Sequence, residues 1–407
     1  MLLEIRDLKI GATIHPPGEK PRDIVIVDGV SASLEKGKVL GLIGESGAGK
    51  STIGLSAMGY GRGGVRITGG EVILNGRDIL KGGTSGLRAL RGKEVCYVAQ
   101  SAAAAFNPAH RLMDQIIEAA LAHGVCSKAE AQKRAIALFR KLGLPNPDNF
   151  GDRYPHQVSG GQLQRAMTVM ALCPQPDLIV FDEPTTALDV TTQIDVLAAI
   201  KEAIRDTGVA ALYITHDLAV VAQIADDIMV LRHGKKVEYG TAEQIIHRPG
   251  EEYTKALVSV RSIAHEEKKP SGEPLLKVMN VSASYGGRKG VPVLSDVSVD
   301  IHRGQTLAVV GESGSGKSTL ARVITGLLPP WAGKIEFEGR ALPARLADRT
   351  KDDLREIQMI YQMADVAMNP RQTVGTIIGR PLEFYFNMRG PERDRRIAEL
   401  LDKIEMG

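Results

Sequence analysis

Cysteine is scarce in this sequence, with three in 407 residues. Cys96, Cys126 and Cys173 are odd in number and widely scattered, and no Cys-x-x-Cys pair or Cys/His cluster accompanies them. This pattern argues against both a disulfide framework and a zinc site. We interpret the three residues as buried or incidental thiols, which a reducing cytosol maintains.

The sequence also lacks long apolar runs and an excess of charge of either sign. No run of about 18 apolar residues occurs, so we expect no membrane span, and any membrane role would depend on a partner. The formal net charge of +3 is close to neutral and gives no indication of nucleic acid or an anionic membrane as a partner. The length is sufficient for two or three domains with sizeable cores.

What the sequence does contain is a glycine-rich phosphate-binding motif, present twice. Each copy fits G-x-x-x-x-G-K-[ST], in which backbone N–H groups surround phosphate oxygens, the lysine reaches the β- and γ-phosphates and the serine ligates Mg²⁺. We therefore predict that the chain binds ATP and Mg²⁺ at two places. The candidate phosphate-binding residues, with Ser51 and Ser318 as metal ligands, are Gly44, Glu45, Ser46, Gly47, Ala48, Gly49, Lys50, Ser51 and Thr52 in the first loop and Gly311, Glu312, Ser313, Gly314, Ser315, Gly316, Lys317, Ser318 and Thr319 in the second.

The repeat extends beyond these loops and indicates the fold class. Residues 27–44 parallel residues 294–311 as a strand, a turn at Gly37 or Gly304, and an apolar strand that leads into the phosphate loop. In both copies we expect a helix to begin at the lysine of the loop. Apolar strands that alternate with helices predict α/β units with a parallel sheet in each copy.

Three short apolar runs, residues 39–43, 178–181 and 210–214, are expected to be strands buried on both faces. Two acidic residues, Asp182 and Glu183, directly follow the second run. Beside a phosphate loop, Asp182 is placed to hold the Mg²⁺ shell and Glu183 to polarise an attacking water.

A short motif then points to a known family. Residues 158–162 read Val-Ser-Gly-Gly-Gln at the start of a predicted helix, where N–H groups and a serine hydroxyl can meet a phosphate. This segment resembles the signature motif of ATP-binding cassette (ABC) ATPases. The resemblance implies nucleotide contacts from Ser159, Gly160, Gly161 and Gln162.

Other positions resemble the family's motifs in the family's order. The resemblance places Gln100 and Gln362 in Q-loops, which sense Mg²⁺ and the transporter, and Asp189 in the D-loop. It makes His216 the switch histidine that contacts the γ-phosphate. Tyr285 fits the aromatic residue that stacks on the base in the second copy, whereas the matching stretch of the first copy has no aromatic residue.

The resemblance also implies the architecture. We expect α/β P-loop NTPase domains of the ABC type, each with a parallel-sheet core, an antiparallel β subdomain and a helical subdomain, in tandem and with the second incomplete. The first cassette would span residues 1–261, a charged Pro/Gly-containing linker 262–274, and the N-terminal part of the second 275–407. In this family two cassettes pair head to tail, so each ATP lies between one cassette's loop and the other's signature.

Three further segments resemble the ATPases of oligopeptide, dipeptide and nickel importers: residues 106–116, 216–225 and 247–257. This resemblance implies a subunit that energises import of peptides or similar small solutes. Its partners would be two integral-membrane permease subunits and an extracytoplasmic solute-binding protein. Its place would be peripheral, on the cytoplasmic face of the inner membrane, and we expect no nucleic acid partner.

Several alternatives remain open. The second copy would lack its own signature, Walker B acid and switch histidine, and we expect the chain to be a fragment of a longer tandem ATPase. Alternatively, another chain supplies that remainder. The function could also be that of a soluble tandem ABC ATPase in translation or on DNA, or of a regulatory nucleotide-binding fragment. We expect the chain to bind ATP but to hydrolyse it feebly unless first cassettes pair between chains.

Overall fold

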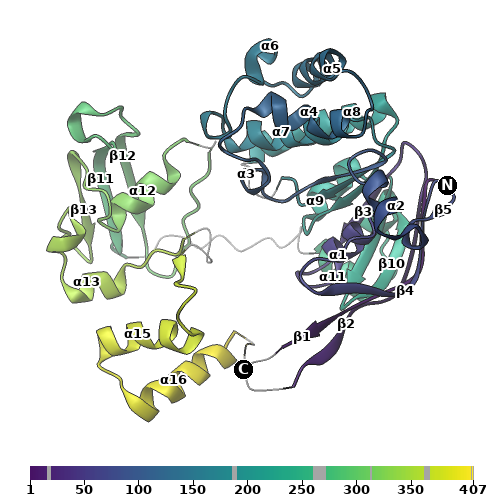
Figure 1. The fold of residues 1–407 in the computed structure, drawn as a ribbon. Helices are drawn as coiled ribbons and strands as arrows, with labels where there is room; N and C mark the ends of the chain where they lie inside the picture. The colour runs from purple at the N-terminus through teal and green to yellow at the C-terminus, as the bar shows by residue number, and fades with distance from the viewer. Residues whose placement is uncertain are drawn as a thin grey trace. The chain divides into compact units, whose positions relative to one another are not determined.

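A computed structural model describes residues 1–15, 20–185, 190–259, 272–311, 314–361, 367–404 and 406 (Figure 1). The chain divides into two compact units, Met1–His265 and Glu266–Gly407. Most of the predicted linker, 262–274, lies outside the described residues. Within the described ranges, no helix has both the length and the apolar character needed to cross a membrane.

The first unit begins with an antiparallel sheet. Apolar and polar residues alternate along its first strand, and Leu3, Ile5, Leu8 and Ile10 are buried on the face that packs on the core. A bulge between Ile5 and Leu8 shifts the register so that both can face inward. The strand order is β2 (Arg22–Leu34), β1 (Leu3–Ile14), β4 (Val65–Leu74), β5 (Arg77–Asp78).

The second sheet of this unit has six strands, in the order β10 (Lys235–Thr241), β9 (Asp227–Arg232), β3 (Val39–Ile43), β8 (Ala210–Ile214), β7 (Leu178–Asp182), β6 (Val95–Val98). All neighbours are parallel except β10, which runs antiparallel to β9 at the edge. Every residue of β3, β7 and β8 is buried, which confirms the three strands predicted from apolar runs. The carboxyl ends of these parallel strands meet at one edge, where ligands bind in open α/β sheets.

Helices complete the first unit, and several of them gather in a layer of their own (Figure 1). In this layer the rings of Phe139 and Phe150 meet edge to face, 5.1 Å apart, within a buried apolar cluster. The antiparallel sheet, the parallel core and the helical layer confirm the predicted three-part fold. The helices are α1 (Lys50–Ser56), α2 (Gly83–Leu90), α3 (Ala102–Ala105), α4 (Leu112–Ala122), α5 (Lys128–Lys141), α6 (Pro147–Phe150), α7 (Gly160–Leu172), α8 (Val190–Thr207), α9 (Leu218–Ile224), α10 (Ala242–His247) and α11 (Glu252–Ser259).

The second unit repeats the antiparallel sheet, even in its irregularities. Asp7 and Asn280 occupy matching positions with φ of +44° and +50°. Each faces a glycine, Gly70 or Gly333, that approaches its carbonyl oxygen too closely to carry a side chain. The strand order is β12 (Leu294–Ile301), β11 (Leu276–Ala283), β13 (Ala332–Phe337), β14 (Arg340–Ala341), and the helices are α12 (Lys317–Ile324), α13 (Lys351–Glu356), α15 (Val374–Phe386) and α16 (Gly390–Asp402).

One prediction for the second unit is wrong. The apolar segment that leads into the second phosphate loop forms no strand, and its residues Leu307, Val309 and Val310 are exposed, Val310 to 88%. Its counterpart β3 forms between β8 and β9, whereas the described residues of the second unit offer this segment no parallel neighbour. Ile360, which matches a residue of β6, is 95% exposed and also outside any strand. A central strand therefore needs its neighbours as well as its own apolar sequence.

Candidate active site

The first phosphate loop connects β3 to α1 at the edge where the parallel strands end. Gly44 has a φ of +151°, and a Cβ added there would lie 2.1 Å from the carbonyl oxygen of Leu231 on β9. A side chain would collide with that backbone, so the loop requires glycine at this position. Gly49, in the left-handed conformation, then caps the start of α1. The loop thus presents a helix N-terminus, which favours anions.

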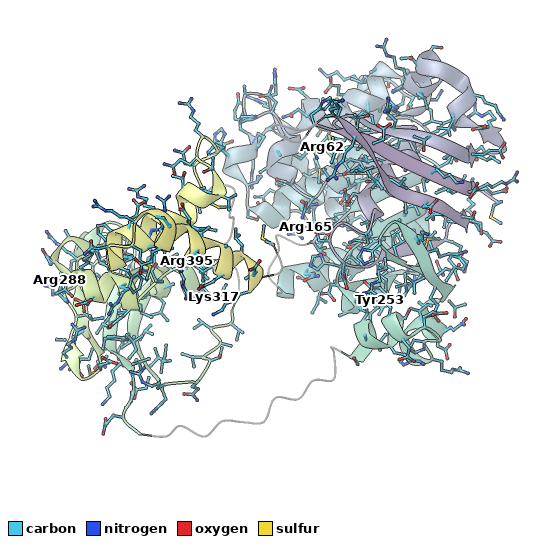
Figure 2. The ribbon with its side chains drawn as sticks, turned by 90° about the horizontal axis from the view of Figure 1, so that it is seen from below. Arg62, Arg165, Tyr253, Arg288, Lys317 and Arg395 are labelled. Carbon is cyan, nitrogen blue, oxygen red and sulfur yellow. The ribbon has the colours of Figure 1, made fainter. Side chains whose placement is uncertain are left out.

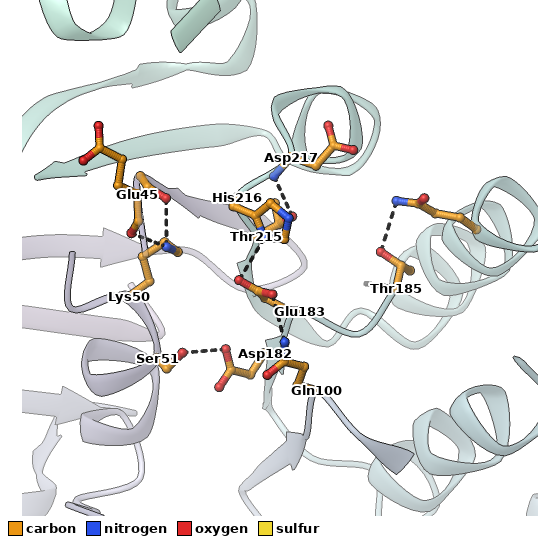
Figure 3. Close-up of polar contacts among 12 residues, drawn as sticks. Glu45, Lys50, Ser51, Gln100, Asp182, Glu183, Thr185, Thr215, His216 and Asp217 are labelled. Carbon is orange, nitrogen blue, oxygen red and sulfur yellow. Dashed lines mark hydrogen bonds and ion pairs between the residues drawn. The ribbon is translucent and has the colours of Figure 1, made fainter. Parts of the chain in front are cut away.

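Lys50, the first residue of α1, is buried within this loop. Its Nζ donates to the carbonyl oxygens of Gly44 and Glu45, both at 2.8 Å (Figure 3). Burial lowers the pKa of Lys50, and nearby carboxylates, Glu183 foremost, oppose that shift. The ammonium group is therefore held at the loop in a partly desolvated place, where a phosphate could compete for it.

Asp182, the last residue of β7, has a partner on each carboxylate oxygen. Ser51 donates its hydroxyl to Oδ1 at 2.8 Å, and Tyr97 of β6 donates to Oδ2 at 2.7 Å. Burial, together with this bond to Asp182, raises the pKa of Tyr97. Hydroxyl and carboxylate oxygens are the ligands that Mg²⁺ prefers, usually alongside phosphates and waters. Ser51 and Asp182 therefore fit a magnesium ion bound to a nucleotide.

Glu183, the first residue beyond β7, lies at the centre of a second polar group. Its φ of +48° is unusual for a residue other than glycine and marks a position held by its surroundings. His216 Nδ1 lies 3.0 Å from Oε1, and Gln100 Nε2 donates to Oε2 at 3.2 Å. The loops after β6, β7 and β8 thus bring these three predicted residues together (Figure 3).

These side chains share one cavity of about 690 Å³. Of the predicted loop residues, Gly44, Glu45 and Ala48 do not line it, and Ala48 is buried. Ile26, which no motif indicated, adds an apolar wall from β2. The described lining consists of Ile26, Ser46, Gly47, Gly49, Lys50, Ser51, Thr52, Gln100, Asp182, Glu183 and His216.

The predicted signature residues lie elsewhere, at the start of α7. Ser159 caps this helix: its hydroxyl accepts from the N–H of Gln162 at 3.3 Å, and the Gln162 side chain accepts from the N–H of Ser159 at 3.2 Å. Gly160 and Gly161 form the first turn. None of these four residues lines the cavity of their own unit.

The second unit carries the other predicted phosphate loop, between residue 311 and α12. Lys317 Nζ donates to the Gly311 carbonyl at 2.7 Å, as Lys50 does to Gly44. Tyr285 lies beside this loop, its hydroxyl 3.3 Å from Thr319 Oγ1. Four predicted site residues lie outside the described residues: Asp189, Glu312, Ser313 and Gln362.

Sequence reasoning missed two side chains that support the site. Tyr97 binds Asp182, but no motif marks it; its place in the strand before Gln100 was the available signal. Gln164, buried on α7, donates to the carbonyl of Ala99 at 3.3 Å and so ties the helix of the predicted signature to the residue before Gln100.

Comparisons with known proteins agree with this geometry. A family model described as ABC transporter matches residues 27–186 and 294–407. A glutathione import ATP-binding protein, GsiA, from Escherichia coli O157:H7 is 34% identical over 422 residues, covering 94% of this chain and 68% of that protein. GsiA from Shigella dysenteriae serotype 1 is 33% identical over the same shares.

Solved structures match in fold. The ATP-binding cassette MJ0796, in a dimeric post-hydrolysis state bound to ADP and Pi, gives a TM-score of 0.51 at 23% identity, covering 59% of this chain and 99% of that one. The protein cbiO1 from Clostridium perfringens, part of the complex cbiONQ, gives 0.52 at 19% identity, with 64% and 95% covered.

Proposed function

Because the chain belongs to the ABC transporter family, we propose that it is the ATP-hydrolysing subunit that energises import of peptides or similar small solutes through permease partners. Its relatives are named for import of glutathione, which is itself a tripeptide. The observation that carries the proposal is the contact of Glu183 with both Gln100 and His216, beside an Asp182 that binds Ser51.

The proposed mechanism follows from these contacts. Lys50 and the loop N–H groups hold the β- and γ-phosphates, and Ser51, Asp182 and Gln100 hold Mg²⁺, which when bound neutralises phosphate charge. Glu183 orients the water for in-line attack on the γ-phosphate, with His216 at its other side. No covalent intermediate on the protein is required.

The domain assignment is part of the proposal. Residues 1–261 form one cassette, and residues 275–407 form the N-terminal part of a second. In this proposal Ser159–Gln162 contact the nucleotide of another cassette, and their position outside the cavity of their own unit supports it. Tyr285 stacks on the base at the second loop. The subunit lies at the cytoplasmic face of the inner membrane and binds two permease subunits. An extracytoplasmic solute-binding protein delivers the solute to these permeases.

The test of the chemistry is Glu183→Gln in the full chain. We expect phosphate release from Mg·ATP to fall by about 100-fold or more, because a positioned general base is lost, while ATP binding remains. The matched control is Glu130→Gln, on the exposed surface of α5, which should release phosphate like the wild type. Equal rates for Glu183→Gln and wild type would overturn the assignment.

The test of the partners is affinity purification of the full chain from detergent-solubilised membranes of its host. We expect two multi-span membrane proteins in stoichiometric amounts. Recovery with ribosomes or DNA-bound proteins, and without membrane proteins, would overturn the importer assignment and favour a soluble tandem ATPase.

A further inference from the structure

One peptide group of the first phosphate loop is held from both ends. Its carbonyl oxygen, on Gly44, accepts from Lys50 Nζ at 2.8 Å. Its N–H, on Glu45, donates to the hydroxyl of Tyr253 at 3.3 Å. Since a trans peptide is planar, its N–H and C=O point in opposite directions. Tyr253 and Lys50 therefore bind opposite edges of the same peptide group and are joined through it.

Tyr253 reaches the loop from α11, more than 200 residues later in the chain, and lies in the first unit (Figure 2). The guanidinium of Arg232, at the end of β9, lies 4.7 Å from the centre of its ring. The segment before α11 is anchored as well, because Glu238 accepts from the N–H groups of Gly250 and Glu251 at 2.8 and 3.1 Å. The hydroxyl of Tyr253 is therefore a fixed acceptor.

Lys50 Nζ donates to two carbonyl oxygens, those of Gly44 and Glu45, and must exchange them for phosphate oxygens when a nucleotide binds. The orientation of the Gly44–Glu45 peptide decides whether the Gly44 carbonyl stays aimed at Nζ. Without an acceptor for the Glu45 N–H, that peptide can rotate, and the lysine then loses one of its two carbonyl partners.

We propose that Tyr253 is a positioning residue for Lys50: it holds the Gly44–Glu45 peptide in the orientation from which the lysine engages the phosphates. The proposal rests on the assignment of the first phosphate loop as an ATP site. It makes α11, a helix outside the described cavity lining, part of the apparatus that sets the affinity and the rate at that loop.

The experiment is a double-mutant cycle in the full chain, read by the binding of a fluorescent ATP analogue. Tyr253→Phe removes the hydroxyl and keeps the ring beside Arg232. We expect affinity to fall about fivefold, the range of one neutral hydrogen bond. In a Lys50→Ala background the same substitution should change affinity less than about twofold, because its effect passes through the lysine. Full additivity of the two substitutions would overturn the proposal.

Tyr239→Phe is the matched control, since Tyr239 also bonds a backbone group, the Ser33 carbonyl at 3.4 Å, but far along β10 from the loop. It should bind the analogue like the wild type, and an equal loss there would also overturn the proposal. If Tyr253→Phe does not fold, Glu238→Gln, which weakens the anchor of α11, takes its place and should lower affinity in the wild-type but not in the Lys50→Ala background. A wild-type chain that binds no ATP would instead refute the proposed function.

Discussion

Asp182 illustrates how a single residue of the site depends on a neighbour that carries no motif. Ser51 and Tyr97 bind its two oxygens, so Tyr97 sets the direction in which Oδ1 faces the proposed metal. In Tyr97→Phe the carboxylate keeps one protein partner and can rotate. We expect the Mg²⁺ concentration at the midpoint of ATP binding to rise about fivefold. We also expect the free energy of unfolding to fall by about 1 kcal/mol. Titration of ATP binding with Mg²⁺, compared with Tyr239→Phe, checks this; an unchanged Mg²⁺ midpoint would contradict it.

Lys50 supplies a prediction about pH. Burial lowers its pKa in the folded protein, so below that pKa the charged lysine destabilises the fold relative to the unfolded chain. Between the folded pKa and the ordinary value of 10.5 the unfolded chain binds more protons, and stability rises with pH. The free energy of unfolding of wild type minus that of Lys50→Met should therefore increase as pH rises toward 10.5. Denaturant unfolding from pH 7 to pH 10 measures this, and a difference that falls would contradict it.

Sequence motifs were sufficient to find the residues of the candidate site to which direct chemical roles are proposed. Lys50, Asp182, Glu183 and His216 each follow a strand or begin a helix at a spacing that the chemistry constrains, and the structure brings them together. Tyr97 could not be found in this way, because its role depends on which strand lies beside β7, and strand order is not a local property of the sequence.

At the scale of elements, the two copies of one sequence pattern show what a strand needs. Val39–Ile43 and the segment before residue 311 are both apolar and both precede a phosphate loop, yet only the first forms a strand. The apolar sequence of a segment indicates its own preference for strand structure. The strands that hydrogen-bond to β3, however, come from residues more than 170 positions away. The prediction failed where those neighbours are not among the described residues.

Helix α7 gives a prediction at the same scale. Gln164 is 3% exposed and donates to the carbonyl of Ala99, so it connects the helix that Ser159 caps to the segment of Gln100. Gln164→Met keeps the volume but leaves that partly buried carbonyl without its donor, which costs about 1 to 3 kcal/mol. We expect a lower midpoint of thermal unfolding and slower ATP hydrolysis.

The control for this prediction is Gln223→Met. Gln223 is exposed and its side chain donates to the carbonyl of Ala219 within its own helix, so its loss should leave both the midpoint and the rate unchanged. If Gln164→Met unfolds at the wild-type midpoint and hydrolyses ATP at the wild-type rate, the bond between α7 and the Gln100 segment contributes nothing to stability or activity.

At the scale of the whole molecule, each proposed nucleotide site needs a signature motif from another cassette. The first unit holds Lys50, Asp182, Glu183 and His216 around one cavity, while Ser159 caps α7 outside it. If the first units of two chains pair head to tail, the loop of one chain faces the signature of the other. Hydrolysis per chain should then rise with chain concentration, and a rate independent of concentration would contradict pairing between chains.

Mixing two inactive variants separates this arrangement from its alternatives. Glu183→Gln lacks the base but keeps its signature, and Ser159→Phe keeps the base but blocks its signature. In a mixed pair, the loop of the Ser159→Phe chain meets the intact signature of the other chain, so one of two sites is complete. Random pairing makes half of the pairs mixed, and an equal mixture should recover about a quarter of the wild-type rate. If one first unit hydrolyses ATP alone, the Ser159→Phe chain should be active by itself. If the first unit instead pairs with the second unit of the same chain, mixing the two variants should recover no activity.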